Sequence, residues 1–383
     1  MKSVYIHIPF CNKICSYCDF TKIYYNKKYI NNYLDTLKYE INNNYQNDLI
    51  KTIYIGGGTP TSLDIDELSK LFNIVNLFKL DKDYEFTIEC NIESLTKDKL
   101  DLFKKNKVNR LSIGIETFNE KFLKYLNRNH TKEEVFNIIG YAKSLFDNIN
   151  IDLIYGLKNQ TIDDLKEDID NFLKLDINHI STYSLIIEPH TVLYINNEEN
   201  IDEDLDYDMY KYICNRLKEK GFIHYETSNF AKPGYESIHN LTYWNNDEYY
   251  GFGLGASGFI NNVRYTNTKS IDKYLNKEFI YEKEEMNDYL NMQNEMILGL
   301  RKLKGVSLDT FKEKYHKDIK EVFNIDKLLE ERKLIIKDGY IFINPEYIYL
   351  SNDILINFIG EEWNKIILKK NIVILKNKNM LII

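Results

Sequence analysis

The regular alternation of short apolar stretches with longer amphipathic ones is the feature that most constrains how this chain folds. The apolar, β-branched stretches occupy residues 4–10, 50–55, 84–90, 110–115, 149–155 and 179–187. The amphipathic stretches between them occupy residues 29–45, 65–78, 97–105, 132–146 and 162–175. This order predicts an α/β fold in which six parallel strands form a closed or partly closed (β/α)6 barrel, with the helices outside.

Two further regions follow the predicted barrel. We expect the barrel core at residues 1–203 and an extension of it in the Tyr-, Gly- and Asn-rich residues 204–283. Residues 284–383 contain helix-like stretches followed by strand-like ones at 334–336 and 340–343, an order that predicts a helical, winged-helix-like C-terminal domain. The last residues, 363–383, alternate Lys and Asn with Ile, Leu and Val, and suggest a hairpin.

The composition is typical of a cytoplasmic globular protein. The 383 residues are 44% hydrophobic and 28% charged, with no apolar run near the ~18 residues that a spanning helix needs. The chain enters a strand-like stretch at once and lacks the apolar region and cleavage site of a signal peptide. A net charge of −8 argues against nucleic acid as a partner.

Three of the five cysteines, Cys11, Cys15 and Cys18, lie within eight residues and predict a metal site rather than disulfides. Three thiolates suit a [4Fe–4S] cluster, because they leave one of its four irons free to bind the amino and carboxylate groups of a small molecule. The alternative is zinc, which needs a fourth ligand such as His7 or Asp19. We favour the cluster, because His7 falls on the strand-like stretch.

Polar and small residues fall at the ends of successive predicted strands, where a parallel barrel places its chemistry. The glycines and threonine at residues 56–59 follow the second strand and lack the Gly-Lys-Ser/Thr ending of a phosphate loop. Alone, this run is equally well explained as a plain strand-to-helix turn. With the cysteine loop one strand away, we favour a backbone that closely approaches the amine or carboxylate of a bound methionine group. The charged candidates are Glu89, Glu116, Arg128 and Asp152. Taken singly, each is better explained as a solvated surface charge or a salt bridge, but their register on successive strands favours a shared site.

Two aromatic-flanked positions are further candidates. His239 opens the sequence His-Asn-Leu-Thr-Tyr-Trp, and its imidazole could ligate a haem iron while Tyr243 and Trp244 cover the macrocycle. The spacing alone favours a structural histidine in an aromatic cluster. Tyr17 precedes Cys18, where it could pack on a bound adenine or simply fill the loop.

These motifs together resemble those of the radical S-adenosylmethionine (SAM) superfamily and, within it, the oxygen-independent coproporphyrinogen III oxidase family. The resemblance spans residues 3–358 and is carried by residues 5–11, 56–61, 109–114 and 150–156, in the expected order. It implies that the three cysteines hold the cluster. It also implies contacts to SAM at Tyr5, Gly57, Gly58, Thr59, Glu89, Arg128 and Asp152. Glu116 stands where the family usually has glutamine.

Two positions point to one branch of that family. The dehydrogenase branch has a further cysteine two residues after the third cluster cysteine, where this chain has Phe20. The haem-chaperone branch, HemW, has an aromatic there and the His-Asn-x-x-Tyr-Trp motif that residues 239–244 match. The resemblance therefore implies haem as a cofactor, held near His239, and haem-requiring respiratory proteins as acceptors. A homodimer and peripheral membrane association are compatible with that role.

Two other functions stay open at this point. One is the oxidative decarboxylation of coproporphyrinogen III by a 5′-deoxyadenosyl radical, in a barrel that excludes water and oxygen. The other is a radical reaction on RNA or a peptide, for which the winged-helix-like region would be suited. The acidic net charge and the absence of a basic tract argue against RNA.

Overall fold

The structure, a computed structural model, describes residues 1–359. The chain divides into two compact units. Unit 1 comprises residues 1–213 and 248–285, and unit 2 comprises residues 214–247 together with the chain from Met286 onward. The expected extension at residues 204–283 thus contributes to both units. The hairpin expected at residues 363–383 lies outside the described residues.

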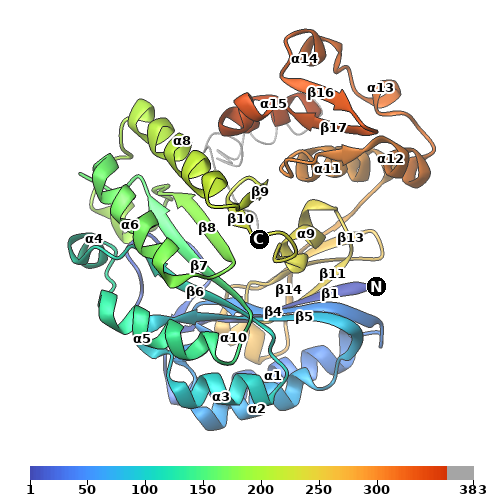
Figure 1. Ribbon diagram of the computed structural model, residues 1–383. Coiled ribbons are helices and arrows are strands. Elements are labelled where there is room, and N and C mark those ends of the chain that lie inside the picture. The colour runs from blue at the N-terminus through green and yellow to red at the C-terminus, as the bar shows by residue number, and fades with distance from the viewer. Residues whose placement is uncertain (360–383) are drawn as a thin grey trace. The chain divides into compact units, whose positions relative to one another are not determined.

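One large sheet runs through unit 1 (Figure 1). Its first six strands are β1 (Lys2–Ile8), β4 (Leu49–Gly57), β5 (Lys79–Asn91), β6 (Arg110–Glu116), β7 (Asn148–Tyr155) and β8 (His179–Ser184). They pair in parallel and in chain order, which confirms the predicted β/α repeats. Beyond β1 the sheet continues through β11 (Tyr249–Phe252), β12 (Ser257–Ile260), β13 (Val263–Asn267) and β14 (Ile280–Glu285). β11 is parallel to β1, and the last three are antiparallel.

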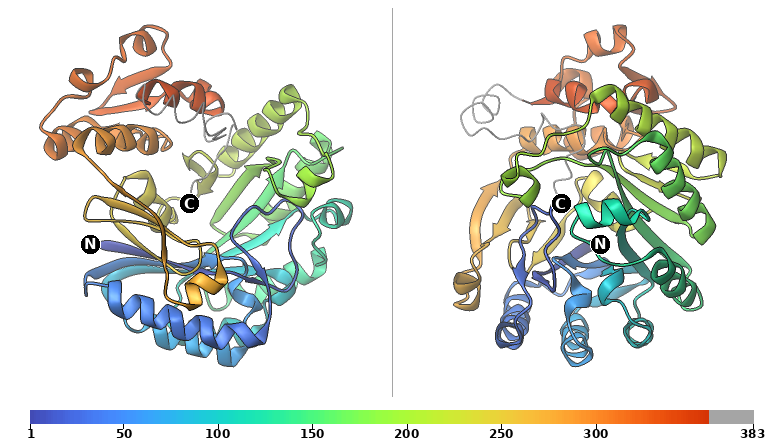
Figure 2. Two further views of the ribbon diagram at one scale, coloured as in Figure 1. Left: turned by 180° about the vertical axis from the view of Figure 1, so that it is seen from behind. Right: turned by 90° about the vertical axis from the view of Figure 1, so that its left-hand side faces the viewer.

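Helices cover the outer side of the parallel strands. The helices between these strands are α1 (Lys27–Asn44), α2 (Ile65–Val75), α3 (Lys97–Lys105), α4 (Glu120–Tyr125), α5 (Lys132–Lys143) and α6 (Ile162–Leu175). Helices α1, α2, α3, α5 and α6 contact one another in that order, and both views of Figure 2 keep α1, α2 and α3 on one side of the strands. Capping boxes begin α2, α5 and α6 at Asp64, Thr131 and Thr161. The remaining elements are short: β2 (Phe10–Cys11), β3 (Ile23–Tyr24), η1 (Pro60–Ser62), η2 (Ile92–Ser94), α7 (Val192–Ile195) and α10 (Ile271–Leu275).

The inner side of the sheet carries polar side chains. Ser112 on β6 pairs in register with Asn150 on β7, which pairs with His179 on β8. The Asn150 amide donates to the hydroxyls of Ser112 (2.8 Å) and Ser181 (3.0 Å). Because side chains alternate along a strand, apolar neighbours such as Ile113 face the helices. The fold therefore buries a polar layer inside the barrel.

Unit 2 combines a hairpin, helices and a small sheet. The helix α8 (Glu203–Glu219) leads into it. Its further elements are β9 (Ile223–Glu226), β10 (Asn229–Ala231), α9 (Ile238–Trp244), α11 (Asp288–Gly299), β15 (Val306–Ser307), α12 (Leu308–Tyr315), α13 (Ile319–Val322), α14 (Asp326–Glu330), β16 (Leu334–Lys337), β17 (Tyr340–Ile343), η3 (Pro345–Leu350), α15 (Ser351–Leu355) and η4 (Ile356–Phe358). The small sheet has the antiparallel order β15-β17-β16. Among residues 1–359, no helix combines the length and hydropathy needed to cross a bilayer.

Candidate functional site

The cysteine loop lies between β2 and β3, directly after the first parallel strand. Cys11 is buried, and Cys15 and Cys18 are half-buried; all three are free thiols. The loop is held against the end of α4, because the Ser16 backbone N–H donates to the Leu126 carbonyl (3.1 Å). This hydrogen bond joins the cysteine loop to the end of α4.

The donor set fits a cluster better than a single ion. Burial raises the pKa of all three thiols, that of Cys18 to about 12, so the thiolates need a positive partner. A cubane cluster would bind the three thiolates at three different irons, and these irons would supply the positive partner.

His7, one of the two candidates for a fourth zinc ligand, is already engaged inside the barrel. Its Nε2 lies 2.7 Å from the carbonyl of Thr21, and its Nδ1 lies 2.9 Å from the hydroxyl of Tyr5. Burial lowers the pKa of His7 to about 4, which keeps the imidazole neutral. His7 and Tyr5 therefore support the first strand from within.

The glycine run at the end of β4 passes close to the cysteine strand. The Gly58 backbone N–H donates to the Ile8 carbonyl, and that of Thr59 donates to the Phe10 carbonyl, both at 2.9 Å. A Cβ on Gly58 would lie 2.7 Å from the Pro9 carbonyl group and 2.9 Å from Cys11 Sγ. The Thr59 hydroxyl lies 3.6 Å from the same sulfur. Glycine is thus required at position 58 for the cysteine to take its place.

Two predicted cofactor-binding acids are half-buried hydrogen-bond acceptors. Glu89 accepts hydrogen bonds from the Tyr54 hydroxyl (2.8 Å) and the Gly57 backbone N–H (3.0 Å), and burial raises its pKa to about 7. Asp152 accepts from the Asn150 amide (2.8 Å), and burial raises its pKa to about 6. Both raised pKa values show that the barrel interior penalises negative charge.

Arg128, which follows α4, is held by two carboxylates. Its Nε and Nη2 donate to the two oxygens of Glu93 (2.7 and 2.8 Å), and its Nη1 donates to Glu116 Oε1 (2.6 Å). Nη2 also donates to the Gly114 carbonyl (2.9 Å). The Tyr17 hydroxyl donates to the same Glu116 oxygen (2.5 Å), which joins the cysteine loop to β6. Tyr17, Glu116 and Arg128 are therefore brought together.

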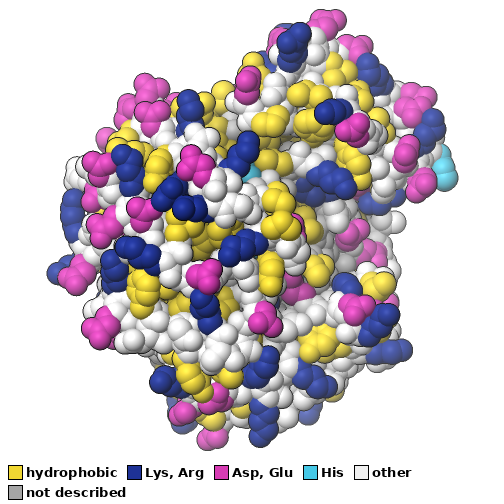
Figure 3. All heavy atoms as spheres, in the orientation of Figure 1, with side chains coloured by type: hydrophobic (Ala, Val, Ile, Leu, Met, Phe, Trp, Pro, Cys, Tyr) yellow, Lys and Arg dark blue, Asp and Glu magenta, His cyan; other side chains and the backbone are white. Residues whose placement is uncertain are grey.

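A cavity of about 260 Å³ opens beside this network, with Cys15, Thr59, Asn91, Glu93 and Arg128 among its lining residues. It is the place in unit 1 where a ligand would meet both the cysteine loop and the glycine run. On the face in Figure 3, basic and acidic side chains are interspersed.

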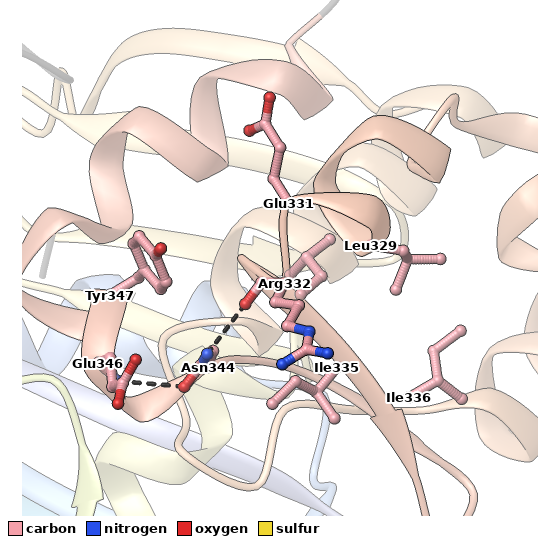
Figure 4. A pocket seen from close by; sticks show the side chains of 9 residues that line it. Leu329, Glu331, Arg332, Ile335, Ile336, Asn344, Glu346 and Tyr347 are labelled. Carbon is pink, nitrogen blue, oxygen red and sulfur yellow. Dashed lines mark hydrogen bonds between the residues drawn. The ribbon is translucent and has the colours of Figure 1, made fainter.

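A larger cavity of about 770 Å³ lies in unit 2, between α14 and the β16–β17 hairpin. Figure 4 shows Ile335 and Ile336 beside it, and the Asn344 amide donating to the Arg332 carbonyl (2.9 Å). It contains none of the residues that the sequence indicated as a site.

His239 lies in unit 2, on α9, and is 1% exposed. Its Nε2 is 2.7 Å from the Tyr243 hydroxyl, and the two rings meet edge to face with centroids 5.0 Å apart. In this conformation, His239 is a satisfied histidine in an aromatic cluster, which is the interpretation that its spacing favoured.

Several site residues were not predicted. Glu93 lies on the short turn η2 after β5, and Tyr54, Asn91 and Asn150 lie on strands beside predicted residues. Glu93 lies four residues after Glu89 and just beyond the end of the strand predicted at 84–90. This proximity to a predicted site residue was the available signal for Glu93. For the other three, the period-two pattern places them on the inner face but does not identify their partners.

Comparisons with known proteins agree on one family. The profile of the Radical SAM superfamily matches residues 5–172, and that of the HemN C-terminal domain matches residues 291–350. The "Heme chaperone HemW" of Bacillus subtilis (strain 168) is 40% identical, over 94% of this chain and 100% of the relative. That of Lactococcus lactis subsp. lactis (strain IL1403) is 37% identical, over 94% of this chain and 98% of the relative.

The fold has a solved counterpart. Coproporphyrinogen III oxidase (HemN) from Escherichia coli, described as a radical SAM enzyme, superposes with a TM-score of 0.83 at 21% identity. The superposition covers 93% of this chain and 89% of that one. At this identity the likeness establishes the fold, and it confirms the partial barrel with a C-terminal domain.

Proposed function

The chain belongs to the HemW family within the radical SAM superfamily, and from this premise we propose that it is a haem chaperone that carries a [4Fe–4S] cluster, binds SAM and delivers haem to haem proteins. One observation carries the proposal: relatives named as haem chaperones match the chain along almost their whole length. Phe20 and the motif at 239–244 support the same branch. The acceptors are haem-requiring respiratory proteins.

The cluster and SAM would be held in unit 1. Cys11, Cys15 and Cys18 would ligate three irons, and the bound cluster supplies an electron and an open coordination site for SAM. The half-buried acceptors Glu89 and Asp152 would receive SAM hydroxyl and amino groups. The hydrogen bond from Ser16 to the end of α4 helps to position the loop that carries these cysteines.

Haem would be bound in unit 2 by His239. Its Nε2 lies against the Tyr243 hydroxyl, so His239 would have to give up that hydrogen bond to ligate the iron. The motif helix α9 has seven residues and is capped at Ser237, so the part that must move is short. Haem binding is therefore expected to be coupled to an opening of α9.

We expect His239→Ala to weaken haem binding at least about tenfold, because it removes the iron ligand. Tyr243→Phe should tighten it roughly threefold, because the competing hydrogen bond is lost while the aromatic ring stays. A haem titration followed by absorbance measures both. Equal affinity of the wild type and His239→Ala would contradict the assigned role of His239.

A product assay distinguishes the alternative function, coproporphyrinogen III dehydrogenation, from the haem-chaperone function. Phe20, an exposed aromatic, takes the place of the cysteine expected for that branch. We expect the anaerobically reconstituted and reduced protein to form no protoporphyrinogen IX from coproporphyrinogen III. Robust turnover in this assay would contradict the chaperone proposal whatever the result of the haem titration.

A further inference from the structure

Arg301, two residues after α11 in unit 2, is a buried cation. It is 6% exposed, and its guanidinium has no hydrogen bond or ion pair among residues 1–359. Burial lowers its pKa to about 10, so the group is still positively charged at neutral pH. A buried charge is normally paired, because it has lost its water and needs a counter-charge in return. The position of Arg301 therefore favours an anionic ligand.

Glu226, at the end of β9, does not supply that counter-charge. It is the acid whose field acts on Arg301, but the two form no ion pair in the described chain. Its oxygens accept instead from the Asn229 amide and the Ser228 N–H (3.4 Å). Burial raises the pKa of Glu226 to about 7, so at neutral pH it carries only part of a negative charge. The guanidinium is thus not neutralised by its acidic neighbour.

An aromatic ring lies beside the guanidinium. The central guanidinium carbon is 5.8 Å from the ring centroid of Trp244, the last residue of α9. A ring face attracts a cation, but it fills none of the five N–H donors of a guanidinium. Trp244 adds a donor of its own, because its indole Nε1 is buried and has no hydrogen-bond partner. Two neighbouring side chains therefore carry donors without acceptors.

Main-chain hydrogen bonds place Arg301 independently of its charge. The Leu303 N–H donates to the Tyr225 carbonyl (3.1 Å), and the Thr227 hydroxyl donates to the Arg301 carbonyl (3.5 Å). These bonds join the segment after α11 to the hairpin of β9 and β10. Because no ion pair of the described chain uses the guanidinium, its charge is available to a ligand.

We propose that Arg301 and the indole N–H of Trp244 bind a carboxylate of the haem cargo, which is one of its two propionate groups. A carboxylate fits both residues, since it brings a negative charge for the guanidinium and acceptor oxygens for both donors. The inference rests on the proposed binding of haem at His239, and it names the part of the haem that a second contact recognises.

The helix α9 connects the two contacts. His239 and Trp244 are five residues apart on it, which is about 7.5 Å along the helix axis. Haem carries its carboxylates on the rim of the macrocycle, away from the iron, so a single haem can reach both residues. An opening of α9 that frees His239 would also move the Trp244 ring and give the carboxylate access to Arg301.

The test compares ferric haem with its dimethyl ester, in which both carboxylates are blocked and the iron and macrocycle are kept. Absorbance titrations of the full chain, in one detergent buffer, give the ratio of the two dissociation constants. The wild type should bind haem about tenfold more tightly than the ester. In Arg301→Gln the ratio should fall to roughly twofold or less, through weaker binding of haem alone.

Three further variants separate the charge from the packing. Arg301→Lys keeps the charge without the planar fork, so the ratio should be about fivefold. Trp244→Phe keeps a ring and removes the N–H, so the ratio should be about threefold. Arg332→Gln, at an exposed position in unit 2, should keep the wild-type ratio.

A wild type that binds haem and the ester equally well overturns the inference and leaves the haem-chaperone proposal standing. A purely structural role of Arg301 would weaken both ligands alike, so a wild-type ratio in Arg301→Gln also overturns it. If Arg301→Gln does not fold, a wild-type ratio in Trp244→Phe decides against the inference. A wild type that binds neither ligand contradicts the proposed haem binding, and the Arg301 inference with it.

Discussion

Replacing Gly58 with alanine is expected to prevent assembly of the [4Fe–4S] cluster. The added Cβ would stand 2.7 Å from the Pro9 carbonyl group and 2.9 Å from Cys11 Sγ, distances at which backbone and sulfur must shift. The Pro9 neighbour is backbone, and Cys11 Sγ is itself the first cluster ligand, so either the backbone of the cysteine strand or that ligand must shift. Iron and acid-labile sulfide per chain after anaerobic reconstitution should fall close to zero, while the wild type loads fully.

Gly140 provides the matched control for this substitution. It lies in α5, and a Cβ there would meet nothing within 4 Å. Gly140→Ala should load the cluster fully. Its free energy of unfolding should rise by up to about 1 kcal/mol, because alanine is the better helix residue. Circular dichroism of both variants shows whether the fold is kept. Full cluster loading by Gly58→Ala would contradict the steric argument.

The parallel strands could be predicted because each is a short apolar stretch, and such a stretch can be recognised from neighbouring residues alone. The strand at 84–90 nevertheless begins at Lys79, since residues 79–85 are charged and give no apolar run. The added strands β11 to β14 were not predicted. β11 pairs with β1 across more than two hundred residues, and a pairing so distant in sequence leaves no local pattern.

The sequence predicted many residues of the site, but it did not predict how they contact one another. The cysteine spacing is local, so the metal loop could be read from residues 11–18. The hydrogen bonds of Arg128 are accepted by carboxylates on η2 and β6. The register of the sheet brings these two elements together. His239 shows the same limit: the motif names the residue, but its burial against Tyr243 depends on tertiary packing.

Glu40 is expected to make the stability of unit 1 fall as the pH rises. This carboxylate on α1 is 2% exposed and accepts from the Gly253 N–H (2.9 Å), the Asn267 amide (2.6 Å) and the Tyr274 hydroxyl (2.6 Å). Burial outweighs these three donors and raises its pKa from 4.5 to about 7. In the unfolded chain the carboxyl ionises near its ordinary pKa of 4.5. Between pH 4.5 and about pH 7, ionisation therefore favours the unfolded state.

Glu40→Gln should remove this dependence. Stability contributed by the protonated acid is fully present below pH 4.5 and is lost as the pH rises toward about 7, a span equivalent to about 3 kcal/mol. Glutamine does not titrate, so the melting temperature of the variant relative to the wild type should rise by about 6 °C between pH 4.5 and pH 8.

The exposed carboxylate of Glu278 supplies the control, and Glu278→Gln should follow the wild type at every pH. Other buried acids, such as Glu89, are common to all three proteins, so their effects cancel in the difference. Parallel pH profiles for the wild type and Glu40→Gln would show that Glu40 is ionised at no cost, and that its three hydrogen bonds fully offset its burial.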